Sequence, residues 1–195
     1  MELSPLARER LARIGALSPE EKEKASQSGE LDSLLSEYFT GNLSSDDLWK
    51  RLKALQDRSG KSITKEAQLK LLDTLRLQMN QVDFEQRRNA ILAVETVKDK
   101  GDYSNLELVL TSLETLRQKY TQIKEQAYQQ LRASVEKQLH AVAQQAIRQG
   151  MKIDMENSID ANVKASPQWK DFISKHEQAC GEMFTSHIDK LRELI

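Results

Sequence analysis

The chain has 195 residues, with 29 Lys and Arg against 30 Asp and Glu, so its formal net charge of −1 gives no bulk attraction for nucleic acid or anionic membrane. Hydrophobic residues make up 38% and aromatic residues 5% of the chain, a mixture typical of long helices. The single cysteine, Cys180, excludes an internal disulfide, and no apolar run approaches the length of a membrane span. We therefore expect a cytoplasmic all-α protein that does not cross a membrane.

Helix starts recur along the first hundred residues. All three prolines follow a serine, and this pair is typical of a helix start because serine suits the N-cap and proline suits the first helical position. Ser44 with Asp47, and Asp83 with Gln86, resemble capping pairs that begin two further helices. These signals, together with apolar residues at helical spacing, predict helices over 5–15, 20–39, 44–60, 62–79 and 83–101.

The stretch 104–149 organises the chain. Ser104 with Glu107 predicts its start, Gly150 predicts its end, and no proline or glycine interrupts it. At 1.5 Å per residue this predicts one helix about 68 Å long. A helix of this length extends beyond any small globular core, so the rest of the chain is expected to lie along it.

One apolar line follows the long helix, and its spacing changes partway. The steps up to Ile123 alternate between four and three residues, the heptad pattern, whereas from Ile123 to Leu139 every step is four residues. We expect the first half, including Leu116 and Ile123, to be buried against the preceding helix. The second half is expected to be straighter or to pack against other partners.

The chain changes character after Gly150. Apolar and polar residues alternate over 151–156, which is typical of a short extended segment or a linker. Pro167 then predicts a last helix to Ile195 that folds back antiparallel on the long helix. The fold expected is an elongated all-α bundle with two parts, an N-terminal bundle over 1–122 and a C-terminal helical hairpin over 123–195.

The C-terminal hairpin is predicted to form a homodimer. Two antiparallel helices leave each other's apolar flanks in water, and a second copy of the same pair would cover them as a four-helix bundle. The expected interface residues are Leu131, Val135, Leu139, Val142, Phe172, Phe184 and Ile188.

Catalytic and cofactor motifs are incomplete throughout the sequence. We therefore expect no enzyme and no cofactor, and favour a helical interaction or scaffold protein. One alternative is a metal-binding protein, because His176, Cys180 and His187 share one face of the last helix and are good zinc or copper ligands. A weaker alternative is nucleic-acid binding through Arg87 and Arg88, which are interleaved with acidic residues.

Overall fold

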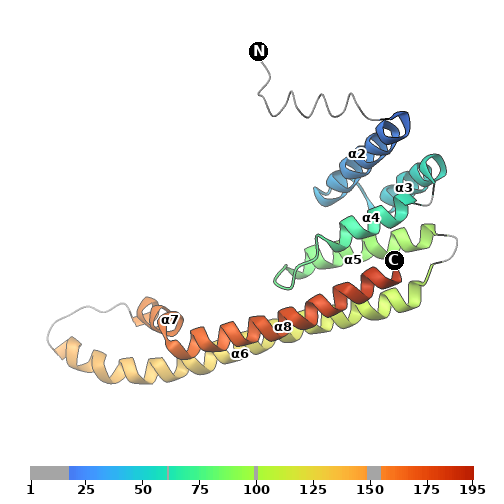
Figure 1. Ribbon diagram of the computed structural model, residues 1–195. Helices are drawn as coiled ribbons and strands as arrows, with labels where there is room; N and C mark the ends of the chain where they lie inside the picture. The colour runs from blue at the N-terminus through green and yellow to red at the C-terminus, as the bar shows by residue number, and fades with distance from the viewer. Residues whose placement is uncertain (1–17, 61, 99–100, 149–154) are drawn as a thin grey trace, which may run out of the picture. The chain divides into compact units, whose positions relative to one another are not determined.

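The computed structural model describes residues 18–60, 62–98, 101–148 and 155–195, with side chains described to residue 140 in the long helix and again from residue 157 (Figure 1). Every regular element in these ranges is an α-helix, so the expected all-α fold is confirmed. The helices are α2 (Pro19–Phe39), α3 (Ser45–Ser59), α4 (Ser62–Leu72), α5 (Gln81–Val97), α6 (Tyr103–Arg148), α7 (Met155–Ala165) and α8 (Pro167–Leu194).

Serine caps begin three of these helices, as predicted. Ser18 forms a complete capping box before α2, since its hydroxyl accepts from the Glu21 amide while its own amide donates to the Glu21 carboxylate. The hydroxyls of Ser44 and Ser166 accept backbone amide hydrogen bonds at the starts of α3 and α8. The helix predicted over 5–15 lies outside the described residues.

Two predicted boundaries, the end of α4 and the start of α5, are wrong, and a side-chain hydrogen bond caps the backbone at each. The helix expected over 62–79 ends at Leu72, and the Thr74 hydroxyl donates to the Leu71 carbonyl over 2.7 Å. Asn80 caps α5, because its side-chain oxygen accepts from the Asp83 amide over 2.8 Å.

The other corrections concern α6 and α7. The long helix begins at Tyr103 rather than at 104, with Asp102 accepting from the Asn105 amide over 3.4 Å. Of the predicted extended segment 151–156, residues 151–154 lie outside the described chain, and Met155 and the residue after it are already helical.

The described chain forms two compact units, and α6 contributes to both. Unit 1 contains α2 to α5, the first turn of α6 as far as Glu107, and the last residues from Leu191; unit 2 contains residues 76–78 and Leu108–Lys190. In unit 1, α3 contacts α2, α4 and α5, and apolar side chains fill the spaces between these helices. The predicted division of the chain into an N-terminal bundle over 1–122 and a C-terminal hairpin over 123–195 stays a prediction.

Unit 2 is organised by α8 lying antiparallel to α6, as predicted (Figure 1). The direction follows from two ring contacts, because Tyr120 meets His176 whereas Tyr128, further along α6, meets the earlier residue Trp169. Leu116, Tyr120 and Cys180 form a buried cluster here, to which Leu77 and Phe184 add partly buried side chains. Ile123 was expected to be buried, and this prediction is wrong, because its side chain is 44% exposed.

Candidate interaction groove

The second half of α6 is poorly covered by the rest of its unit. No side chain of α6 between Thr121 and His140 is buried, whereas Leu113, Leu116 and Tyr120 in the preceding turns are. The apolar row of Leu131, Val135 and Leu139 is half-buried here, although large aliphatic side chains are usually inside a folded protein. This row is therefore the part of the predicted interface that is open to a partner.

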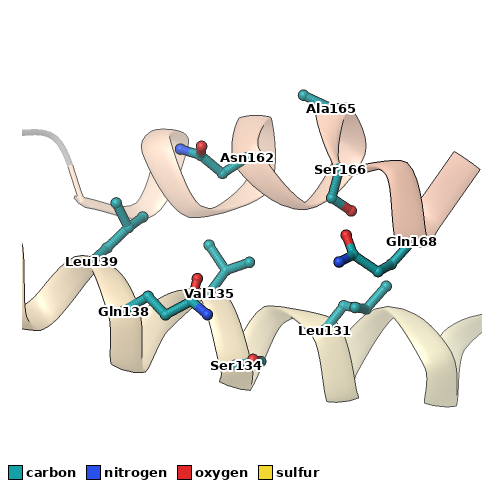
Figure 2. Close-up of a pocket in the computed structure, with 9 residues that line it drawn as sticks. All are labelled: Leu131, Ser134, Val135, Gln138, Leu139, Asn162, Ala165, Ser166 and Gln168. Atoms are coloured by element: carbon teal, nitrogen blue, oxygen red, sulfur yellow. The ribbon is translucent and has the colours of Figure 1, made fainter.

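A groove runs beside this row, between α6 and the corner where α7 meets α8. Its volume is about 660 Å³, and Figure 2 shows Leu131, Val135 and Leu139 pointing from α6 toward the opposite helix. Ser134 and Gln138 complete the α6 side. The opposite side is formed by Asn162, Ala165, Ser166 and Gln168. The lining is thus an apolar row edged by uncharged hydroxyl and amide groups.

Packing and polar contacts hold α7 against α6 beyond the groove. Ile159 and Val163 are 4% and 0% exposed, and they form the buried side of α7. Asp160 faces Arg132 of α6 at 3.6 Å and accepts a hydrogen bond from Tyr128. The pKa of Tyr128 is raised above its usual value, first by burial and then by this carboxylate. The groove is therefore bounded by a helix attached at several points.

A row of stacked rings fixes α8 along α6 at the other end of the groove. Tyr128 meets Trp169 edge-on at 5.3 Å, and Trp169, Phe172 and His176 then stack at centroid distances of 5.7 and 5.3 Å. His176 finally stacks on Tyr120 at 4.9 Å with an interplanar angle of 3°. Such contacts restrict geometry as well as burying area, so they determine how α8 lies on α6.

Comparison with known proteins places this C-terminal region within a family. Residues 49–195 match a family described as a family of unknown function, DUF6657. The chain belongs to the DUF6657 family. No curated protein and no solved structure matches the chain. The DUF6657 region contains the whole groove and the ring row, and α2 lies before its first residue.

Three other predicted interface residues lie on α8, and Ile188 among them is less exposed than the row of Leu131, Val135 and Leu139. Within the DUF6657 region, Ile188 is only 8% exposed, while Phe172 and Phe184 are half-buried among the α6–α8 contacts. Val142 lies beyond the described side chains. Asn162, Ser166 and Gln168 were not predicted as lining residues, although the serine–proline pair at 166–167 marks the turn that places them.

Two of the three predicted metal ligands, His176 and Cys180, lie close together in the DUF6657 region. Among the side chains that the structure describes, no group of three or more His, Cys, Asp or Glu residues is arranged to hold a metal ion. His176 Nε2 lies 3.0 Å from the Tyr120 carbonyl oxygen, which can only accept, so Nε2 carries the proton. In the neutral imidazole, His176 Nδ1 then accepts from the Cys180 thiol, whose sulfur is 3.8 Å away. Burial raises the pKa of the Cys180 thiol, which favours this protonated arrangement.

Two charged side chains, Glu177 and Lys124, form hydrogen bonds with the Tyr120 hydroxyl in unit 2. This hydroxyl donates to Glu177 over 3.2 Å, and Lys124 Nζ donates to the hydroxyl over 3.4 Å. Burial, with a smaller effect of the Glu177 charge, raises the pKa of Tyr120 to about 12. Tyr120 is therefore a neutral hydrogen-bond donor at neutral pH and links α6 to α8.

The arginines proposed for nucleic acid already have partners in unit 1. Arg87 donates to the Asp83 carbonyl over 2.9 Å, and its guanidinium lies 4.7 Å from the Phe39 ring centroid. Arg88 lies 3.6 Å from a Glu107 carboxylate oxygen.

In the part of the chain that is described, no helix is long and apolar enough to cross a membrane.

Proposed function

We propose that this protein is a non-catalytic helical interaction protein that forms a homodimer through its C-terminal half. The observation that carries the proposal is the half-exposed row of Leu131, Val135 and Leu139 beside an open groove. Fully burying one such side chain stabilises by about 1.5–3 kcal/mol, so completing the burial of three half-exposed ones is worth on the order of several kcal/mol. A partner that covers the row gains this energy.

The lining chemistry supports binding rather than catalysis. None of the described residues that line the groove carries a titratable side chain, and general acid–base catalysis requires such a group near the reacting atoms. Hydroxyl and amide groups instead donate and accept hydrogen bonds, so they suit the rim of a contact between polypeptides.

The experiment is a mass measurement by light scattering at micromolar concentration. We expect twice the 22.3 kDa chain mass for the natural sequence. A Val135→Lys and Leu139→Lys double variant should be a folded single chain, because forming the dimer would bury two lysine charges in each chain without partners. A single species near the chain mass for the natural sequence would refute the dimer.

A matched control separates the loss of the row from a change in net charge. Gln126 and Gln130 are exposed on α6, and at 100° per residue they lie about 140–180° around the helix from Val135. The Gln126→Lys and Gln130→Lys double variant adds the same charge and should remain dimeric. Circular dichroism should show unchanged helix content in both double variants.

A further inference from the structure

The groove has a lining that is complementary to itself. The three aliphatic side chains on α6 provide the apolar part, and the remaining polar side chains are all hydroxyls or amides (Figure 2). Each hydroxyl and amide both donates and accepts hydrogen bonds, so a copy of the same surface can satisfy it. A charged partner segment, by contrast, would meet no opposite charge among the described residues of the lining.

The second half of α6 has the composition that this lining requires of an occupant. On the side that faces the groove, α6 carries Leu131, Val135 and Leu139 together with the uncharged Ser134 and Gln138. Its apolar residues follow steps of four, which form a ridge along the helix. Two ridges of this type interdigitate when their helices cross at about −50°, the commonest packing class in globular proteins. The α6 helix is therefore both one wall of the groove and a suitable occupant of it.

The other candidate element, α8, fits less well. Several of its apolar and aromatic side chains are already buried or stacked, since Ile188 and Cys180 are 8% and 5% exposed and the rings of Trp169 and Phe172 are stacked, whereas Met183 is 48% exposed. Its outward positions carry charges, including the exposed ion pair of Lys175 with Asp171. Seating this surface in the groove would remove water from these charged groups without providing partners, whereas the α6 residues that line the groove are uncharged.

We infer that the groove is occupied by α6 of a second copy, with the two rows of Leu131, Val135 and Leu139 in contact across the two-fold axis. This inference rests on the proposed homodimer and specifies its contact. Val135 is the middle residue of the row. Either direction of the second helix therefore brings the two Val135 side chains together, whereas Gln130 stays on the outer face.

Cysteine cross-linking of the full-length protein tests this contact. Val135→Cys and Gln130→Cys variants are oxidised mildly at micromolar concentration and separated on non-reducing gels, with the natural sequence as background because its Cys180 is buried. We expect at least a fivefold larger disulfide-linked dimer fraction for Val135→Cys than for Gln130→Cys. Unchanged circular dichroism confirms that both variants are folded.

The outcomes separate this inference from the proposed function. If light scattering shows a dimer but Val135→Cys cross-links no more than Gln130→Cys, the α6–α6 contact is wrong and the homodimer proposal stands. If light scattering shows a single chain, both are wrong. Preferential cross-linking at Val135 in a species of twice the chain mass supports both.

Discussion

Glu95 is the buried carboxylate on which the start of α6 depends, and its removal is the most informative perturbation of unit 1. The residue is 3% exposed near the end of α5. Its carboxylate accepts from Lys98 Nζ over 2.8 Å, from Gln68 Nε2 over 2.6 Å and from the Asp102 amide over 2.7 Å. These contacts connect α4, α5 and the residue that precedes α6.

The expected cost of Glu95→Ala follows from the groups left behind. Removing one partner of a buried ion pair costs about 3–5 kcal/mol, and a buried donor without an acceptor costs about 1–3 kcal/mol. The Lys98 side chain is 16% exposed and therefore regains some water, so we expect about 3–5 kcal/mol in total rather than a larger sum. Glu95→Gln keeps the shape but loses the charge, and we expect about 2 kcal/mol, as for hydrogen bonds to charged groups.

Urea unfolding followed by circular dichroism measures these changes in free energy. Asp57→Ala is the control, because Asp57 is exposed on α3 and surface substitutions usually change stability by less than about 0.5 kcal/mol. A change of that small size for Glu95→Ala would refute the reasoning, since it would mean that the carboxylate is not buried among these donors.

The same site predicts a dependence of stability on pH. Burial alone would raise the pKa of Glu95, but the hydrogen bonds from Lys98, Gln68 and the Asp102 amide outweigh it and hold the pKa below the usual 4.5. A pKa lowered by folding stabilises the protein above pH 4.5, and this stabilisation is lost as pH falls through the folded-state pKa. When the pH is lowered from 7 to below 4.5, the free energy of unfolding should therefore fall less for Glu95→Gln than for the natural sequence.

Three further predictions concern stability and metal content. Gly101→Ala should destabilise by about 1–3 kcal/mol in urea unfolding, as overpacking does, because its Cβ would lie 2.7 Å from Glu95 Oε1; Gly29→Ala, with open space at its Cβ, should instead stabilise α2. Leu116→Ala should cost about 2–5 kcal/mol as a core truncation, and an effect near zero would exclude Leu116 from the cluster with Tyr120. Protein purified without chelator should carry less than one zinc, copper or iron ion per chain by elemental analysis; one tightly held ion lost in a His176→Ala and Cys180→Ala double variant would contradict this.

Local signals in the sequence were sufficient for several helix starts and for the long helix. A serine hydroxyl reaches amides two or three residues away, so Ser18 and Ser44 mark helix starts without any tertiary contact. The uninterrupted stretch between Tyr103 and Arg148 likewise requires only the absence of proline and glycine. The row of steps of four that contains Val135 was also visible in the sequence.

Only the tertiary structure decided which parts of these helices are covered. Ile123 continues the apolar line by a step of three from Tyr120, yet it is exposed, because the contacts of α6 with α8 pass from Tyr120 to Tyr128, two steps of four further along. Glu95 is charged and would be expected at the surface, but donors from three different segments surround it. The polar wall of the groove comes from α7 and the corner at Ser166, which reach α6 through contacts separated by about thirty residues of chain. Spacing within one helix carries no information about such contacts, because they depend on where the returning chain packs.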